Sequence, residues 1–149
     1  MTAHRIRGMR WWDIADVHAI EESVFAETAW TPAQFWSELA QDDRTYLVCE
    51  ASGRIAAYGG VMVRPPTADI QTIAVSAEHR GHGLARELLE HLLAVADHRD
   101  CSEVLLEVRA DNAPAIALYA SEGFEVIARR SSYYGPGLDA LIMRRRPRD

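Results

Sequence analysis

The sequence predicts an α/β fold in which helices cover both faces of one mixed sheet. Apolar residues recur at helical spacing in several segments, and other short runs are rich in β-branched residues and bounded by turns. The order of the segments points the same way: a strand and two helices, then three strands, then alternating helices and strands before a last strand pair. The chain of 149 residues can bury a substantial core, and we expect one domain over residues 1–149.

The N-terminal segment contains a candidate strand and a helix. Residues 6–10 are expected to form the strand. Asp13 is expected to cap a helix that runs to about Phe25, because apolar residues then recur on one face. Met9 is an alternative start of the protein, in which case residues 1–8 are an extension.

A second helix and a strand pair follow. The helix has the clearer start, with Thr31 as N-cap, Pro32 at the first helical position and Gln34 completing a capping box. Residues 44–63 are interpreted as two strands joined by a turn at Ser52–Gly53.

The second half of the chain alternates strands and helices. After a break at Pro65–Pro66, residues 68–75 resume as a strand, and a long helix with a wide apolar face starts at Gly83. The nearly continuous apolar run 102–110 is typical of a strand buried in a sheet. A short helix then ends at Gly123.

Composition limits the classes of function. The net charge of −6 argues against a nucleic-acid-binding protein. No apolar run approaches the roughly 18 residues of a membrane span, and the N-terminal residues show no apolar leader core. Cys49 and Cys101 lie in apolar runs and are expected to be buried free thiols, which fits a cytoplasmic location.

A glycine-punctuated turn, Arg80–Gly83, directly precedes the long helix in "RGHGLARELLEHLL". The open N-terminus of a helix presents unpaired N–H groups and the positive end of the helix dipole, which together bind anions, most often phosphate. Glycines at 81 and 83 let the backbone approach an anion without a Cβ in the way. The pattern matches neither a P-loop nor a dinucleotide fingerprint. The residues alone leave phosphate binding and simple helix entry open.

Two motifs resemble those of the GNAT N-acetyltransferases. "IQTIAVSAEHRGHGLARELLEHLL" is similar to the family's acetyl-CoA signature, Gln/Arg-x-x-Gly-x-Gly/Ala, and "LEVRADNAPAIALYASEGF" is similar to its second signature, with an Asn and a Tyr on one helix. The resemblance spans nearly the whole chain. It implies a sheet of about seven mostly antiparallel strands with a central parallel pair, four helices on both faces, and acetyl-CoA as co-substrate. The residues that it assigns to acetyl-CoA are Ile73, Ala74, Val75, Arg80, Gly81, His82, Gly83, Leu84, Ala85, Arg86, Asn112 and Tyr119.

A narrower resemblance is to the RimI-type enzymes, which acetylate the N-terminal alanine of a small-subunit ribosomal protein. It rests on "LEVRADNAPAIALYASEGF", on "RRSSYY" and "DALIM", and on the upstream "AWTPAQFWSEL". The chain is predicted to end in two strands, residues 124–134 and 139–145, and the loop Gly135–Leu138 between them is shorter than this type leads us to expect. The resemblance implies a protein N-terminus as acceptor, with a basic ribosomal protein as partner, and leaves the peptide specificity open.

Acetylation of an amine needs a proton acceptor for the amine and a proton donor for the departing thiolate. Glu107, a lone carboxylate in "LLEVR", is expected to be buried, which would raise its pKa toward that of a general base. The resemblance supports this role, and the alternative is an ion pair with Arg109. Tyr119 is the candidate acid and shares a helix face with Asn112, two turns earlier; the alternative is a core tyrosine.

Aromatic residues are the candidates for the acceptor site. Tyr133 and Tyr134 are expected to line a peptide groove, with Trp30 as a weaker candidate, and plain packing is the alternative for all three. The acidic positions that could attract a basic acceptor, or simply form a solvated face, are Glu21, Glu22, Glu27, Asp42 and Asp43.

Three further points follow from the side chains present. No metal site is expected, because His79-x-x-His82 lacks additional ligands at suitable spacing. No cysteine is placed to carry an acetyl group, so we expect direct transfer in a ternary complex. Two other functions stay open: acetylation of a small amine, which a pocket with several carboxylates would favour, and a non-catalytic acetyl-CoA sensor.

Overall fold

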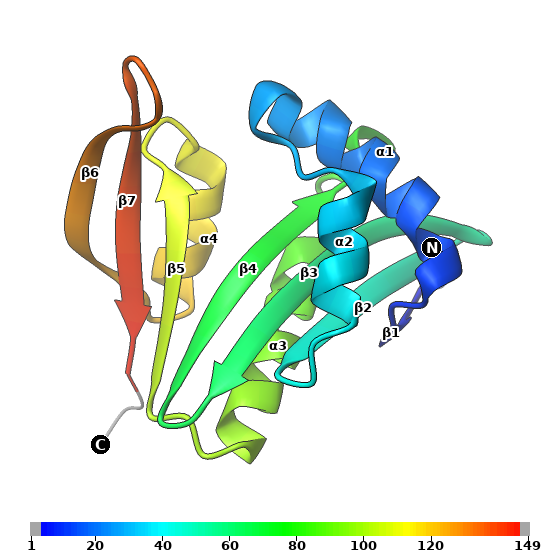
Figure 1. Ribbon diagram of the computed structural model, residues 1–149, viewed down its shortest axis with the longest axis horizontal. Coiled ribbons are helices and arrows are strands. Elements are labelled where there is room, and N and C mark those ends of the chain that lie inside the picture. Colours follow the sequence, from blue (N-terminus) through cyan, green and yellow to red (C-terminus); the bar gives the residue numbers. More distant parts are fainter. Residues whose placement is uncertain (1–3, 147–149) are drawn as a thin grey trace.

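The computed structural model describes residues 4–146, which contain seven strands in one sheet and four α-helices (Figure 1). The strands are β1 (His4–Gly8), β2 (Arg44–Ala51), β3 (Arg54–Arg64), β4 (Thr67–Val75), β5 (Glu103–Arg109), β6 (Glu125–Gly135) and β7 (Leu138–Arg145). The helices are α1 (Ile14–Phe25), α2 (Pro32–Leu39), α3 (Leu84–His98) and α4 (Ala113–Ser121), with short 3-10 helices η1 (Trp11–Asp13), η2 (Ala26–Thr28) and η3 (Ala77–His79).

The strand order β1-β2-β3-β4-β5-β7-β6 confirms the predicted mixed sheet. Neighbouring strands are antiparallel except β4 and β5, which form the expected central parallel pair. Helices α1 and α2 pack on one face, where Val17 and Phe35 are fully buried in a cluster with Tyr58. Helices α3 and α4 lie on the other face (Figure 1), where Leu89 and Leu92 of α3 join the main core. The predicted fold class is therefore confirmed.

The core under α3 fixes the start of that helix. The buried side chains of α3 are Leu84, Leu88, Leu89, Leu92, Leu93 and Ala96. Each fully buried leucine contributes about 1.5–3 kcal/mol through the apolar surface that it removes from water. Because Leu84 is the first helical residue and is only 5% exposed, the first turn of α3 is held against the sheet.

Strands β4 and β5 separate soon after they pair. Their parallel pairing covers only Thr67–Ile70 and Glu103–Leu106. Immediately beyond, the register between β3 and β4 shifts, because Gln71 is an extra residue on β4. A bulge bends its strand, and Figure 1 shows β4 and β5 diverging past this point. The sheet therefore has an opening at its centre.

The first strand begins earlier than predicted. It comprises His4–Gly8 rather than residues 6–10, and all five of its residues pair with β2. Residues 4–8 thus form the edge strand of the sheet; residues 1–3 lie outside the described residues.

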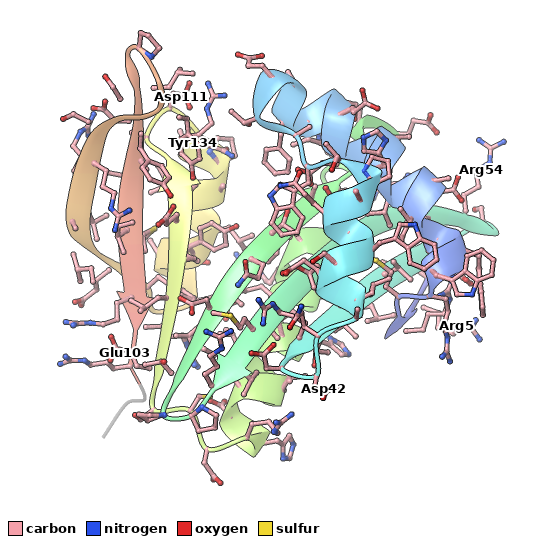
Figure 2. All side chains as sticks on the ribbon, viewed as in Figure 1. Arg5, Asp42, Arg54, Glu103, Asp111 and Tyr134 are labelled. Carbon is pink, nitrogen blue, oxygen red and sulfur yellow. The ribbon has the colours of Figure 1, made fainter. Side chains whose placement is uncertain are left out.

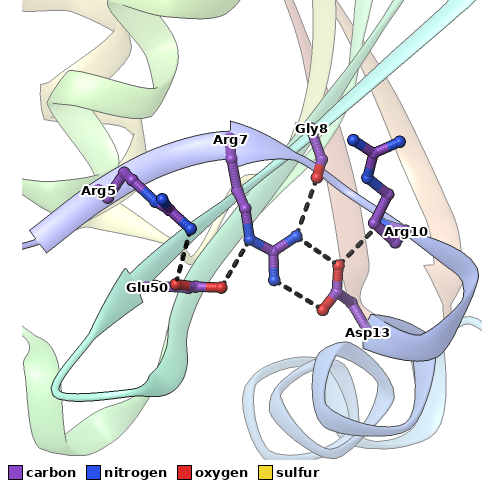
Figure 3. Close-up of polar contacts among 6 residues, drawn as sticks. All are labelled: Arg5, Arg7, Gly8, Arg10, Asp13 and Glu50. Atoms are coloured by element: carbon purple, nitrogen blue, oxygen red, sulfur yellow. Dashed lines mark hydrogen bonds and ion pairs between the residues drawn. The ribbon is translucent and has the colours of Figure 1, made fainter.

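Asp13 occupies the N-cap position of α1, which ends at Phe25 as predicted, but its side chain makes no capping hydrogen bond. The Asp13 carboxylate instead accepts hydrogen bonds from the Arg7 guanidinium at 2.8 and 2.9 Å and from the Arg10 N–H at 2.7 Å (Figure 3). Arg7 also donates to Glu50 at 2.6 Å, so one guanidinium joins β1, β2 and η1. The Arg7 guanidinium holds the pKa of Asp13 below its usual value, because it stabilises the ionised carboxylate.

Other local predictions are confirmed. Helix α2 has its capping box: Thr31 Oγ1 accepts from the Gln34 N–H at 3.2 Å, and Gln34 Oε1 accepts from the Thr31 N–H at 2.7 Å. The turn at Ser52–Gly53 joins β2 to β3 with left-handed backbone at both residues. The β6–β7 loop is shorter still than expected, because both Gly135 and Leu138 belong to strands.

Cys49 and Cys101 are free and buried, as predicted, and burial raises the pKa of both thiols. Within residues 4–146, the helices are too short or too polar to cross a membrane.

Candidate active site

Three adjoining hollows occupy the opening between β4 and β5. Figure 2 shows Asp111 and Tyr134 at the end of the sheet where the two strands are farthest apart, and Glu103 at the end where they pair. The α3-side hollow is lined by Phe25, Ile73, Ala74, Val75, Arg80, Ala85, Asn112 and Tyr119, among others. The central hollow is lined by Glu21, Thr28, Trp30, Ile73, Glu107, Asn112, Tyr119 and Tyr134, among others. The β6-side hollow is lined by Trp30, Asp69, Gln71, Glu107, Arg130, Tyr133 and Tyr134, among others.

The N-terminus of α3 lies beside the α3-side hollow and has free backbone donors. Its N-cap is Gly83, with φ 76° and no side-chain cap. The N–H of Glu87 bonds to the Gly83 carbonyl at 3.1 Å, so the preceding N–H groups, of residues 84–86, have no helical acceptor. Gly81 is also left-handed, at φ 82°, and a Cβ at either glycine would meet no atom within 4 Å. The turn is therefore open toward solvent and suited to an anion.

The side chains of this motif have different surroundings. Leu84 is buried in the core, so only its backbone can reach a ligand. Arg86 forms an ion pair with Glu122, with a distance of 2.5 Å between Nη1 and Oε1. Arg80 is exposed and lines the α3-side hollow, whereas His82 is exposed but lines none of the three hollows. Of the two arginines expected near a diphosphate, Arg80 is the one that faces the hollow.

The end of β4 offers a free backbone edge. Residues Ile73–Val75 pair with Ala57–Gly59 of β3 on one side. On the other side, the pairing with β5 stops at Ile70, so in residues 4–146 this edge has no strand partner. Its N–H and C=O groups can therefore bind a ligand that enters the opening. The Ala74 side chain is buried, as expected of a core residue.

Tyr119 and Asn112 lie on the same face of α4 and line both the α3-side and central hollows. Tyr119 is 8% exposed, and its ring meets Phe124 edge-on, with 5.9 Å between centroids. Burial, together with the nearby Tyr134 phenol, raises the pKa of Tyr119 to about 12, so the hydroxyl is protonated at neutral pH. Asn112 Oδ1 accepts from the Ala115 N–H at 3.3 Å, so Asn112 also caps α4.

Glu107 lines the central and β6-side hollows, but the prediction that it is buried is wrong. Its side chain is 37% exposed, because it points to the face of β5 opposite to buried Leu106 and Val108. The nearest cation is Arg130, at 3.8 Å. The alternative partner, Arg109, binds Asp111 instead, at 2.9 and 3.1 Å. Glu107 is thus open to solvent and to the hollows at once.

The three predicted acceptor-site aromatics all line hollows. Trp30 and Tyr134 line both the central and the β6-side hollow, and Tyr133 lines the latter. The rings of Tyr133 and Tyr134 meet edge-on, with centroids 5.1 Å apart. The Arg130 guanidinium lies over the Tyr133 ring at 5.2 Å. One side of the opening is therefore an aromatic wall.

Two carboxylates in these hollows have surroundings that the sequence did not indicate. Glu21, expected at the surface, is 2% exposed and lines the central hollow; burial raises its pKa. Asp69 on β4 is half-buried in the β6-side hollow, and burial raises its pKa too. The burial of Glu21 depends on Tyr58 and Trp30, which are distant in sequence, so no local pattern could have shown it.

No group of three potential metal ligands is found in residues 4–146. His79 is engaged elsewhere, with its Nδ1 2.7 Å from Ser76 Oγ.

The chain belongs to the GNAT family of acetyltransferases, because the model described as "Acetyltransferase (GNAT) family" matches residues 11–124. The "N-alpha-acetyltransferase RimI" of Mycobacterium tuberculosis is 36% identical over 132 residues, which cover 85% of this chain and 82% of that protein. The "[Ribosomal protein bS18]-alanine N-acetyltransferase" of Escherichia coli K12 is 34% identical over 134 residues, which cover 88% of this chain and 89% of that protein. The crystal structure of the ribosomal-protein-S18-alanine N-acetyltransferase from Escherichia coli matches with a TM-score of 0.88 and 32% identity, over 97% of this chain and 94% of that one.

The predicted GNAT fold and the RimI-type resemblance are thereby confirmed, and the protein is an N-acetyltransferase that uses acetyl-CoA. The residues fit this co-substrate. The open turn Gly81–Gly83 and the free N–H groups of residues 84–86 suit a diphosphate, and the free edge of β4 suits an extended chain of amides. The alternative of a non-catalytic acetyl-CoA sensor is set aside.

Proposed function

We propose that this enzyme transfers the acetyl group of acetyl-CoA to the N-terminal α-amine of a protein, first of all the N-terminal alanine of a small-subunit ribosomal protein. The observation that carries the proposal is the continuity of the hollows. The central hollow adjoins the α3-side hollow, which lies beside the anion-binding turn, and on its other side an aromatic-walled hollow. A peptide end suits this shape, because its amine can reach the centre while the following residues lie along the aromatic wall. The RimI relatives support the same acceptor.

The α3-side hollow is the proposed seat of acetyl-CoA. The backbone of Gly81–Ala85, with the charge of Arg80, takes the diphosphate at the positive end of α3. The free edge of Ile73–Val75 takes the amides of the pantetheine arm and the thioester oxygen. Asn112 lies beside the arm, where the α3-side and central hollows meet.

Glu107 and Tyr119 face the central hollow from β5 and α4 and divide the proton transfers between them. Glu107 takes a proton from the acceptor's ammonium group, directly or through a water, which frees the nitrogen lone pair to form the N–C bond. The base contributes little to the rate near neutral pH, because an α-amine has a pKa of about 8 and part of it is already unprotonated. Tyr119 donates its hydroxyl proton to the sulfur as the C–S bond breaks. The nitrogen, which is cationic once the N–C bond has formed, releases its second proton to solvent, and the phenolate regains one from solvent. Backbone N–H groups of β4 stabilise the charge that develops on the thioester oxygen.

Transfer is direct in this proposal. Neither Cys49 nor Cys101 lines the three hollows, and both thiols have raised pKa values. A buried thiol of raised pKa is a poor nucleophile. Both substrates are therefore bound together in a ternary complex.

The charge of the β6-side hollow supports a basic acceptor. Asp69 and Glu107 line it against the single cation Arg130, and Asp69 has no ion-pair or hydrogen-bond partner within residues 4–146. Arg44 and Arg64, whose charges act on Asp69, are bound by other carboxylates. An arginine or lysine near the acceptor's N-terminus would balance this surplus negative charge.

A small amine is the second candidate acceptor. The central and β6-side hollows hold three carboxylates, Glu21, Asp69 and Glu107, where the sequence indicated one. Several carboxylates around an opening suit a polyamine as well as a basic peptide.

We also propose that the enzyme works in the cytoplasm, where free buried thiols such as Cys49 and Cys101 persist. The absence of a nucleic-acid partner stays a prediction from the net charge of −6.

A thiol-release assay tests the proposed acceptor. Acetyl-CoA is offered with hexapeptides that differ at residue one, each in a basic and an acidic version, and with spermidine and an amine antibiotic in parallel. We expect release with basic peptides that start with alanine or serine. Release with the small amines alone would refute the protein acceptor while leaving the cofactor site intact.

A further inference from the structure

Glu21 has surroundings that the reaction itself does not explain. It comes from the buried face of α1, it is 2% exposed, and it lines the central hollow. An ionisable carboxylate in an apolar layer is costly unless it is hydrogen-bonded. The apolar cluster around it contains Val17, Phe35 and Tyr58. A role for Glu21 must therefore be sought in its contacts.

Both carboxylate oxygens of Glu21 have partners. Oε2 accepts a hydrogen bond from the Trp30 N–H at 2.9 Å. Oε1 accepts one from the hydroxyl of Tyr58, which is fully buried on β3. Tyr58 pairs in register with Ala74 of β4, next to the backbone edge proposed to hold the thioester. Glu21 thus connects the main chain at Trp30 to the sheet at the acetyl-transfer centre.

The segment that Glu21 holds forms a wall of the acceptor site. The connection from α1 to α2 supplies Thr28 and Trp30 to the central hollow, and Trp30 also lines the β6-side hollow. Its other hydrogen bonds are local. The Ala26 N–H bonds to Glu22 and the Thr28 hydroxyl to Phe25, both in the last turn of α1. The Ala29 N–H bonds to Ala26 at 3.1 Å, and the Thr31 N–H bonds to Gln34 of α2 at 2.7 Å. Of these bonds, the one from the Trp30 N–H reaches a side chain on the buried face of α1.

We infer that Glu21 is a positioning residue for the acceptor: it sets the distance between the Trp30 wall and the β4 edge, and so the fit of the substrate amine in the central hollow. The inference rests on the proposed function, in which the acceptor enters between Trp30 and the Tyr133–Tyr134 wall. Glu21 acts through Trp30, to whose main-chain N–H one of its oxygens is hydrogen-bonded. Glu21 does not line the α3-side hollow, the proposed seat of acetyl-CoA.

The test compares Glu21→Ala, Glu21→Gln and Glu38→Ala with the wild type. Glu38 is a matched control, since its Oε1 also accepts from a tyrosine, Tyr46, at 2.7 Å, yet it lines none of the three hollows. Glutamine at position 21 keeps an oxygen for the Trp30 N–H and offers its amide N–H to the Tyr58 oxygen. Acceptor KM, kcat and the acetyl-CoA Kd are measured for each variant.

We expect Glu21→Ala, which loses both hydrogen bonds, to raise the acceptor KM about tenfold, with the acetyl-CoA Kd unchanged. Glu21→Gln should restore the acceptor KM, and Glu38→Ala should leave it unchanged. An unaltered KM in folded Glu21→Ala would overturn the inference, and so would equal rises in Glu21→Ala and Glu38→Ala. A Glu21→Gln variant as impaired in kcat as Glu21→Ala would overturn it too, because the charge would then act on the reaction.

A folding failure of Glu21→Ala and a failure of the proposed function can be distinguished from a failure of this inference. If Glu21→Ala fails to fold, Tyr58→Phe removes one of the two hydrogen bonds, and a smaller rise in acceptor KM is expected; no change would overturn the inference. If the wild type acetylates no peptide, the proposed function fails by itself, and the same KM comparison is made with the amine that it does acetylate.

Discussion

At the scale of residues, the two proposed catalytic groups differ in their surroundings. Tyr119 is enclosed by α4 and the core, whereas Glu107 is open to solvent beside Arg130. A protonated phenol beside the co-substrate and an accessible carboxylate beside the acceptor suit a donor and an acceptor of protons, respectively.

Replacing Tyr119 by phenylalanine tests the donor. The ring and its packing on Phe124 remain, so we expect the folded state and the acetyl-CoA Kd to be preserved. The turnover number should fall about 100-fold, a typical loss for a general acid. A thiol-release assay measures the turnover number, and isothermal titration calorimetry measures the acetyl-CoA Kd. Turnover equal to that of the wild type would assign Tyr119 to the core alone.

The pH profile tests the same residue without a mutation. The protonated phenol is the active form, and its pKa is raised to about 12, so activity is not lost to Tyr119 ionisation at any lower pH. The rate should rise as the acceptor amine loses its proton, near its pKa of about 8, and then stay level. A profile of kcat/KM from acid to alkaline pH checks this. A descending limb centred near the ordinary tyrosine value of about 10 would contradict it.

The sequence allowed the site residues to be chosen, but not their burial or exposure to be predicted. Glu107 and Tyr119 could be selected because a motif places them, and the aromatics Trp30, Tyr133 and Tyr134 do line the hollows. The exposure of Glu107 and the burial of Glu21 could not be predicted, because both depend on strands and loops far apart in sequence.

At the scale of elements, the start of α3 is the feature on which cofactor binding depends. Gly83 and Gly53 are a matched pair: their φ angles are 76° and 74°, and a Cβ at either position would meet nothing within 4 Å. Alanine should therefore strain both backbones equally, by about 1 kcal/mol.

Only Gly83→Ala should also weaken the binding of acetyl-CoA, because it disturbs the free N–H groups at the positive end of the α3 dipole. We expect its acetyl-CoA Kd to rise about tenfold, a change of about 1.4 kcal/mol. Gly53→Ala, in the β2–β3 turn, should lose the same stability in urea unfolding and keep the wild-type Kd. Equal Kd values for the two variants would place the diphosphate elsewhere.

Elements with a local cause were predictable. The capping box of α2 and the turn at Ser52–Gly53 are set by adjacent residues, and both were confirmed. The bulge at Gln71 was not predicted, because it exists only through the register with β3. That bulge accompanies the separation of β4 from β5, so the opening itself could not be derived from the sequence pattern.

At the scale of the whole molecule, the ion cluster of Arg7 joins the edge of the sheet to the helical layer. The Asp13 side chain is 6% exposed and depends on Arg7 for its charge partner. Arg7→Met should cost about 3 kcal/mol, because it leaves a buried carboxylate unpaired. Arg5→Met is the control: Arg5 is 71% exposed and its pair with Glu50 spans 3.4 Å, so we expect a loss below about 1 kcal/mol. Urea unfolding measures both.

The Arg7 effect should depend on pH. The pKa of Asp13 is lowered in the folded state, so its contribution is fully present above the unfolded value of 3.8 and is lost as the pH falls through the lower folded value. The stability difference between wild type and Arg7→Met should therefore be constant near neutral pH and shrink below about pH 4. A difference that stays the same at pH 3 would show that Arg7 stabilises through packing alone.

The global fold was largely predictable because the order of strands and helices constrains how they can pack. The order alone did not specify the GNAT fold; the two motifs at α3 and α4 did. The edge strand β1 was placed too late in the chain, since His4 and Arg5 are polar residues that carry no strand pattern of their own.

Tandem mass spectrometry of one reaction product tests the central claim most directly. The enzyme is incubated with acetyl-CoA and a basic peptide that begins with alanine and contains internal lysines, and the acetyl group is located by fragmentation. We expect acetylation of the α-amine in the wild type and only a trace in Tyr119→Phe. An acetyl group on lysine side chains, or an unmodified peptide under conditions in which spermidine is acetylated, would contradict it.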